Sequence, residues 1–187
     1  MTNLIPKIYF LMNKPTGYVC SHVSDSHKTV YDLLSPELQQ LLHAKRGERL
    51  HTVGRLDCDT SGLLLFTNDG DFSHRLTDPE NHIPKTYIAT LKNPVLDKDK
   101  PGYSEYFSVP HTLPAEKKSP EQTAEPAQID FISDTECKVT ITQGKFHQVR
   151  RMFLPLGNEV IKLHRIAFGD YLLPKTLCPG EYHFFDN

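Results

Sequence analysis

The sequence lacks long apolar runs and has no recognisable export signal. Its longest apolar stretches, such as Ile8–Met12 and Leu63–Phe66, are far shorter than the roughly 20 residues that a membrane-spanning helix needs. The N-terminal segment MTNLIPKIYFLMNKP has no basic region followed by an apolar core and a small-residue cleavage site, as a secretion signal would. We therefore expect a cytoplasmic protein with no membrane partner.

Closely spaced metal ligands are also missing. Cys20, Cys58, Cys137 and Cys178 are scattered and form no Cys-x-x-Cys pair, which disfavours both a zinc site and a disulfide framework. The ten histidines form no His-Glu-x-x-His or comparable spacing. We expect reduced thiols and no bound metal.

Positive charge is slightly outnumbered by negative charge and is unevenly placed along the chain. The net charge of −2 over 187 residues argues against a protein that holds nucleic acid by bulk electrostatics. Residues 143–165 nevertheless carry five Lys or Arg against one acid, whereas residues 97–136 carry nine acids against four lysines. This asymmetry favours one basic surface, the alternative being an ordinary solvated face.

The pattern of apolar residues and turn residues predicts more strands than helices. A hairpin is expected where Lys7–Met12 and Tyr18–Ser21 flank the turn residues 13–17, and residues 93–126 form a proline-rich, partly mobile excursion. Further strands are expected at Leu63–Thr67, Lys85–Leu91, Ala127–Ile132, Cys137–Thr142, Val160–Ile166 and Glu181–Phe185. Helices are expected at Ser35–Leu42, at Asp71–Leu76 with Asp71 as the cap, and at Phe146–Leu156. We predict an α+β class, with a mixed, largely antiparallel sheet flanked by helices, in a single domain of residues 1–187.

The stretch GRLDCDTSGLLLFTNDG, residues 54–70, places polar residues on a tight loop before a buried strand. Gly54 permits unusual backbone angles, and Asp57 and Asp59 are separated by one small residue. A carboxylate on such a loop is rigidly supported with its head free. The alternative is that Asp57, Asp59 and Thr60 only cap a turn.

A second stretch, QGKFHQVRRMF at residues 143–153, predicts an amphipathic helix. At 100° per residue Phe146 joins the apolar face, Arg150 falls at its edge and Arg151 points nearly opposite. Arg150 can therefore reach a partly buried carboxylate, and Arg151 is better placed for solvent or for phosphate.

These two stretches closely resemble the motifs of RNA pseudouridine synthases of the RsuA branch, which isomerise single uridines in ribosomal RNA. The resemblance extends through YFLMNKPTGYVCS, the Lys-Thr-Tyr of residues 85–87, LHR at residues 163–165 and PGEY at residues 179–182, leaving out the proline-rich middle. It implies the pseudouridine synthase catalytic fold with a central cleft.

The resemblance also implies roles for individual residues. Asp57 would be the catalytic aspartate, Tyr87 the aromatic residue against the target uracil, and Arg150 the basic partner of the aspartate. Arg55 would help to fill the space left by the flipped nucleotide. The remaining basic residues that we expect to contact RNA are Lys145, His147, Arg151, Lys162 and Arg165. Tyr87 as an ordinary strand aromatic and Arg55 as an ordinary phosphate contact are the alternatives.

The expected reaction needs no cofactor, since no group is lost and nothing is oxidised or reduced. The expected partner is ribosomal RNA or an assembling ribosomal particle. We expect the chain to lack the small basic S4 module common among RsuA-like enzymes, so that affinity comes from the basic surface of the catalytic domain or from recognition of the particle. Small-subunit rRNA is favoured over large-subunit rRNA. The rival functions are a catalytically silent RNA-binding or ribosome-assembly factor and, from Ser61, Asp69 and His74, a hydrolase that no motif supports.

Overall fold

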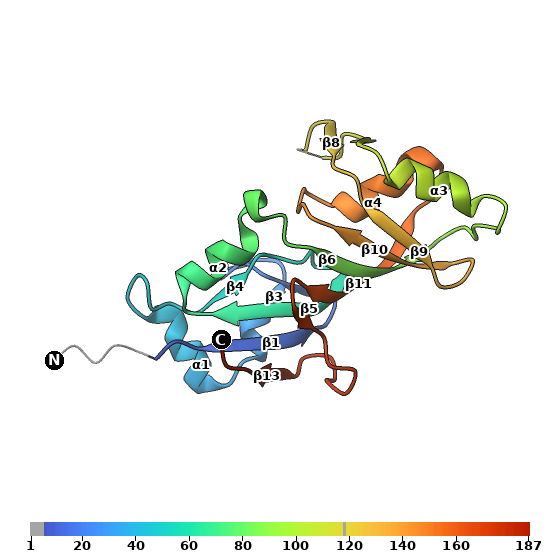
Figure 1. The fold of residues 1–187 in the computed structure, drawn as a ribbon. Helices are drawn as coiled ribbons and strands as arrows, with labels where there is room; N and C mark the ends of the chain where they lie inside the picture. Colours follow the sequence, from blue (N-terminus) through green and yellow to red (C-terminus); the bar gives the residue numbers. More distant parts are fainter. Residues whose placement is uncertain (1–5, 118) are drawn as a thin grey trace. The chain divides into compact units, whose positions relative to one another are not determined.

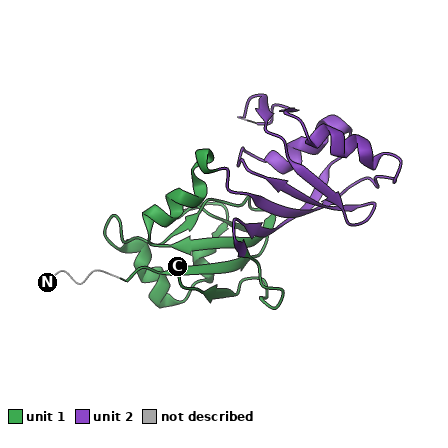
Figure 2. Ribbon diagram, in the orientation of Figure 1, with its two compact units in different colours: residues 1–81, 172–187 green, residues 82–171 purple. Residues whose placement is uncertain are grey.

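The computed structural model describes residues 6–117 and 119–187, which fall into two compact units (Figures 1 and 2). Unit 1 comprises residues 6–81 and Leu172–Asn187, and unit 2 comprises His82–Tyr171. Strands and helices alternate without a regular repeat, and the α+β class expected from the sequence is confirmed.

Unit 1 is built on an antiparallel sheet in the order β13, β1, β5, with β4 also paired to β5. Phe10 stacks on Phe66 across β1 and β5 with ring centroids 4.7 Å apart, and both rings are fully buried. The C-terminal strand therefore closes one edge of this sheet (Figure 1). The elements are β1 (Tyr9–Lys14), β2 (Tyr18–Val19), β3 (Lys28–Thr29), α1 (Pro36–Gln40), β4 (His51–Val53), β5 (Thr60–Thr67), α2 (Gly70–Thr77) and β13 (Tyr182–Phe184).

Two expectations for unit 1 are wrong. β1 and β2 form no hairpin: β2 pairs in parallel with β3, while β1 lies between β5 and β13. The cap of α2 is Asp69 rather than Asp71, since the Asp69 side chain accepts the Asp71 N–H. Because Asp69 lies two residues after the end of β5 and caps α2, it fixes the bend between strand and helix.

Unit 2 is built on antiparallel strands in the order β11, β6, β10, β9. α3 packs beside β9, and α4 packs beside β7 and β11. Phe107 and Phe153 meet in the core with ring centroids 5.1 Å apart. The elements are β6 (Lys85–Leu91), α3 (Lys100–Phe107), β7 (His111–Leu113), β8 (Gln122–Ala124), β9 (Gln128–Phe131), β10 (Glu136–Ile141), α4 (Gln148–Phe153) and β11 (Val160–Phe168), with β12 (Tyr171–Leu172) at the boundary.

The proline-rich excursion is more ordered than its composition suggests. Residues 93–126 include α3 and the antiparallel pair β7–β8, neither of which the sequence pattern predicts. The pair packs against α4, so the excursion forms part of the core of unit 2.

α4 begins two residues later than expected. His147 has a left-handed backbone (φ 46°) and precedes the helix, so Phe146 lies outside it and its side chain is 44% exposed. The expectation that Phe146 belongs to the buried helix face is therefore wrong.

Candidate active site

Asp57 lies on a short loop of unit 1 between β4 and β5. Gly54 opens the loop with a φ of +69°, a value that favours glycine, and the Thr60 N–H closes it on the Asp57 carbonyl at 3.1 Å. Leu56 is buried, the Asp57 side chain is half-buried, and Arg55 is exposed. The buried Leu56 side chain thus anchors the loop, and the neighbouring side chains of Arg55 and Asp57 remain accessible to solvent.

The fully buried ammonium of Lys14 forms hydrogen bonds with the backbone of this loop. Its Nζ donates to the carbonyls of Thr60 at 2.8 Å, Pro15 at 3.0 Å and Asp57 at 3.1 Å. Burial lowers the pKa of Lys14, and the nearby thiols and carboxyls of Cys20, Cys58, Asp57 and Asp59 oppose that shift. The cation therefore fixes the backbone of the loop that carries Asp57.

Two stretches of the sequence are thus one structural feature. The Gly17 N–H donates to the Cys58 carbonyl at 2.8 Å, and the Leu56 N–H lies 3.3 Å from Cys20 Sγ. The turn after β1 and the loop before β5 support each other through these contacts. Sequence reasoning missed Lys14, although a lysine at the end of an apolar strand and before a proline is the signal that could have found it.

Tyr87 lies on β6 of unit 2, between Val139 on β10 and Arg165 on β11. Its side chain is 7% exposed, so its ring is largely buried in the sheet and only a small part reaches solvent.

Lys85 lies two residues before Tyr87 on β6, and its side chain lies near that of Arg165 on β11. Lys85 Nζ and Arg165 Cζ each lie 5.0 Å from the centroid of the Phe168 ring. Burial, followed by the charge of Arg165, lowers the pKa of Lys85 to about 8. Arg165 is only 2% exposed, so the expectation that it lies on an exposed basic surface is wrong, while its contact with RNA stays a prediction.

Arg150 is half-buried on α4 and is tied to the next strand. Its Nη1 donates to the Val160 carbonyl at 2.7 Å, which joins the helix to the start of β11. A guanidinium held in this way keeps a fixed direction, as pairing with a carboxylate requires.

Among the predicted site residues, Arg151 differs most clearly from the prediction, which placed its side chain toward solvent. Its side chain is fully buried, and its guanidinium donates to the carbonyls of Pro114 at 2.8 Å and Pro120 at 2.8 Å, among other acceptors. The segment containing β7 and β8 covers the helix face that the periodicity assigns to solvent. Arg151 therefore binds protein carbonyls, and the expectation that its side chain faces solvent is wrong. Its contact with RNA stays a prediction.

The other predicted RNA contacts differ in accessibility. Lys162 is exposed and Lys145 is half-buried. His147 Nδ1 lies 2.9 Å and 3.1 Å from the two carboxylate oxygens of Glu116, and its ring stacks on Phe146. His147 thus anchors the excursion, and its role in RNA binding stays a prediction.

The predicted site residues are divided between the two units. Arg55 and Asp57 belong to unit 1, whereas Tyr87, Arg150 and Lys162 belong to unit 2. Within unit 2, Tyr87 and Arg165 are direct neighbours across β6 and β11. A shared cleft for Asp57, Tyr87 and Arg150 stays a prediction.

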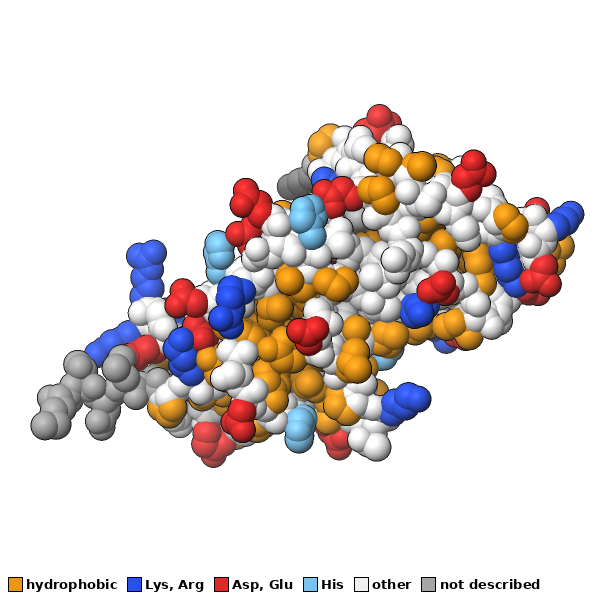
Figure 3. Space-filling model, viewed as in Figure 1, with side chains coloured by type: hydrophobic (Ala, Val, Ile, Leu, Met, Phe, Trp, Pro, Cys, Tyr) orange, Lys and Arg blue, Asp and Glu red, His pale blue; other side chains and the backbone are white. Residues whose placement is uncertain are grey.

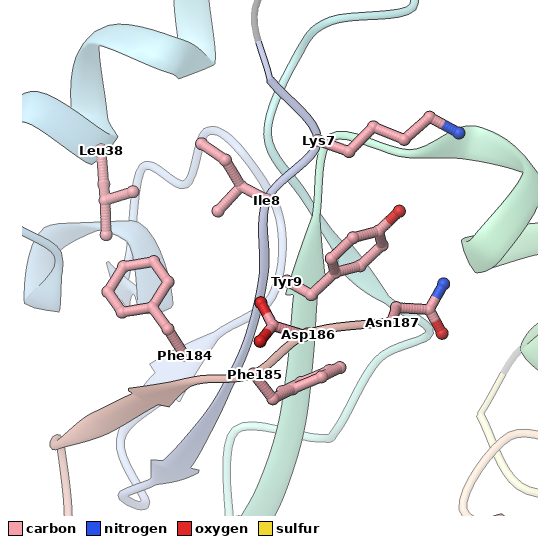
Figure 4. A pocket seen from close by; sticks show the side chains of 8 residues that line it. All are labelled: Lys7, Ile8, Tyr9, Leu38, Phe184, Phe185, Asp186 and Asn187. Atoms are coloured by element: carbon pink, nitrogen blue, oxygen red, sulfur yellow. The ribbon is translucent and has the colours of Figure 1, made fainter.

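A separate hollow of about 450 Å³ lies in unit 1 (Figure 4). Ile8, Leu38 and Phe184 point toward one another within it, while Lys7 points away. Figure 3 shows hydrophobic side chains gathered over β1 and β13 on the same unit. None of the predicted catalytic or RNA-binding residues lines this hollow: its lining is Lys7, Ile8, Tyr9, Leu38, Phe184, Phe185, Asp186 and Asn187.

Within residues 6–117 and 119–187, no group of three or more His, Cys, Asp or Glu side chains is placed to hold a metal ion. Over the same described residues, every helix is too short or too polar to cross a membrane.

Comparison with known proteins gives a consistent result. A family model described as RNA pseudouridylate synthase matches residues 8–154. The ribosomal small subunit pseudouridine synthase A of Yersinia pestis is 43% identical over 174 residues, covering 93% of this chain and 67% of the relative. The protein of the same name from Escherichia coli (strain K12) is 42% identical, covering 93% and 68%.

Solved structures agree with these matches. A crystal structure of a pseudouridylate synthase superposes with a TM-score of 0.84 at 39% identity, covering all of this chain and 73% of the other. The archaeal box H/ACA sRNP Nop10–Cbf5 complex gives a TM-score of 0.60 at 17% identity, covering 92% and 51%, and so shares the fold alone.

Proposed function

The chain belongs to the RNA pseudouridylate synthase family, and from that membership we propose that it converts one uridine of small-subunit (16S) ribosomal RNA to pseudouridine. The observation that carries the choice of substrate is the 43% and 42% identity to two enzymes named for the small subunit, over 93% of this chain. The partner is the RNA itself or an assembling ribosomal particle.

The reaction breaks the bond between N1 of uracil and C1′ of ribose and forms a bond from C1′ to C5. The proton lost from C5 is balanced by a proton gained at N1, so the product is an isomer. Nothing is oxidised or reduced, and the residues of the chain can carry the reaction without a cofactor.

Asp57 is the proposed catalytic residue. Attack on the sugar and removal of a ribose proton both require its carboxylate to be ionised. A guanidinium nearby favours the charged form and directs it, and Arg150 is the proposed source. The support for this assignment is the rigid Asp57 loop on Lys14 and the anchored Arg150 side chain.

Tyr87 and Arg55 are the proposed contacts of the extruded nucleotide. Taking a base out of its stack costs a few kcal/mol, and stacking on an aromatic ring returns roughly 1–3 kcal/mol per base. Tyr87 is held by strands on both sides, and the Arg55 side chain is exposed at the edge of the Asp57 loop.

The test is to incubate the protein with unmodified 16S rRNA, 23S rRNA and small-subunit particles, and to map pseudouridine chemically at single-nucleotide resolution. We expect one modified uridine in the 16S RNA. Modification in 23S rRNA alone would contradict the choice of subunit. RNA binding with no product would instead indicate a catalytically silent factor.

Asp57→Asn is the matched control for this experiment. Because the loop is held through backbone carbonyls, the variant should fold and bind RNA with the wild-type affinity while giving no product. Normal turnover by purified Asp57→Asn protein would refute the assignment of Asp57.

A further inference from the structure

Unit 1 carries a group of basic side chains that none of the roles above uses. His22 comes from the loop after β2, Arg49 from the loop before β4, and His51 is the first residue of β4. Burial lowers the pKa of His22, as do the charges of Arg49 and His51, so the three side chains are electrostatic neighbours. We call His22, Arg49 and His51 the unit 1 basic cluster.

The cluster stands on a fixed support. The His22 ring stacks on Tyr31 with centroids 4.5 Å apart and planes 13° apart, and Tyr31 is 3% exposed. Tyr31 Oη accepts the Thr52 N–H at 3.3 Å and lies 3.3 Å from His22 Nε2. His51 Nδ1 donates to the Arg49 carbonyl at 3.0 Å. These contacts hold the imidazoles in place before any ligand arrives, which lowers the entropic cost of binding.

The cluster also lacks a neutralising partner. In residues 6–117 and 119–187 no carboxylate lies within 4.0 Å of the side-chain nitrogens of Lys45, Arg46 or Arg49, and all three side chains are exposed. Residues 43–51 carry these three cations and two histidines against the single acid Glu48. By contrast, Lys92, Lys100 and Lys138 of unit 2 each pair with a carboxylate.

The position of the cluster along the chain relates it to Asp57. Arg49 precedes Asp57 by eight residues, and β4 leads directly into the Asp57 loop. Eight fully extended residues span at most about 28 Å. An extended anion held at Arg49 and His51 therefore lies within a few nucleotides of a base at Asp57.

We propose that the unit 1 basic cluster, with Lys45 and Arg46 beside it, binds the backbone phosphates of the RNA strand that flanks the target uridine. This proposal rests on the proposed function, because it names where the same substrate is gripped. Exposed Arg and Lys side chains that lack carboxylate partners and lie near imidazoles have the chemistry of a phosphate site. The cluster supplies affinity that the net charge of −2 does not.

The test compares wild type with Arg49→Gln, and uses Lys98→Gln as the matched control. Lys98 is an exposed lysine of unit 2, outside every site described above. Steady-state turnover of a 16S fragment is measured over a range of salt concentrations, and the fold is checked by thermal unfolding. We expect Arg49→Gln to raise KM about threefold to tenfold at moderate salt with an unchanged kcat. The slope of log kcat/KM against log salt should become shallower by about 0.7–0.9, while Lys98→Gln leaves both quantities unchanged.

An Arg49→Gln enzyme with the wild-type KM and salt slope would overturn the proposal. A rise in KM confined to the ribosomal particle, with naked RNA unaffected, would also overturn it by indicating an acidic protein segment as the occupant. If wild type gives no product at all, the proposed function fails. Equilibrium binding of the same fragment to the same three proteins then still measures the salt slope.

Discussion

The Lys14 side chain lies in the interior of unit 1, where its four carbonyl partners come from the Asp57 loop and from the turn after β1. A buried cation is costly unless its donors are satisfied, and most of the partners of Lys14 are main-chain atoms of the Asp57 loop. Lys14 therefore acts as a positioning residue, through the backbone of Asp57.

Lys14→Met keeps the length of the side chain and removes its donors. The carbonyls of Asp57 and Thr60 then lose a buried partner, so we expect the free energy of unfolding to fall by about 2–4 kcal/mol. Displacement of Asp57 should lower kcat about tenfold to a hundredfold in the folded protein. Urea unfolding and single-turnover kinetics measure the two effects, and Lys98→Met at an exposed site should change neither. A folded Lys14→Met protein with wild-type kcat would contradict the positioning role.

For single residues, the sequence patterns predicted the local backbone structure better than they predicted the burial of the side chains. The loop around Asp57 and the position of Tyr87 on a strand follow from local turn and strand signals. Arg151 and Arg165 do not, because their burial depends on β7, β8 and the neighbouring strand, which lie distant in sequence. Helical periodicity predicts the face of the helix on which a residue lies, but it does not predict which other segments cover that face.

At the scale of the secondary-structure elements, a hydrogen-bond network around the Asp69 carboxylate stabilises the junction of β5 and α2. Lys7 Nζ and Tyr9 Oη each donate to Asp69 Oδ2 at 2.8 Å, and Asp69 Oδ1 accepts the Asp71 N–H. Burial raises the pKa of Asp69, but the hydrogen bonds from Lys7, Tyr9 and the Phe72 N–H outweigh it and lower the pKa from 3.8 to about 2. The ionised carboxylate thus ties β1 to the start of α2.

Asp69→Asn keeps the helix cap and removes the charge. Because the folded pKa is depressed, the stabilisation is complete above pH 4 and is lost as the pH falls toward 2. We expect the variant to lose about 1–2 kcal/mol of unfolding free energy at pH 7, and the difference from wild type to shrink between pH 4 and pH 2. Urea unfolding across this pH range provides the measurement, with the exposed Asp71→Asn as control. A difference that does not depend on pH would rule out the charge as its source.

Elements with a self-contained signal were predicted well. Lys85–Leu91 has the predicted bounds of β6, since its alternation and flanking residues suffice to define a strand. The hairpin of β1 failed because strand pairing is decided by partners far along the chain: β1 pairs with β5 and β13 rather than with the segment after its turn. Composition alone also hid α3 and the β7–β8 pair within a proline-rich segment.

For the molecule as a whole, the net charge bears on whether naked rRNA or a ribosomal particle is the better substrate. A net charge of −2 gives little non-specific attraction to RNA, so a folded particle that presents the target uridine should be the better substrate. At physiological salt we expect a higher kcat/KM on small-subunit particles than on naked 16S rRNA. Equal values for the two substrates, measured side by side, would contradict this expectation.

In the proposed reaction, Asp57 acts on a nucleoside that lies against Tyr87, with Arg150 directing the carboxylate. A crystal structure of the protein bound to an RNA fragment containing its target uridine tests this claim most directly. We predict an extruded nucleoside with an Asp57 carboxylate oxygen within about 3.5 Å of its sugar, and with its base on the Tyr87 ring. A bound uridine far from Asp57, or one stacked on another aromatic residue, would contradict the account.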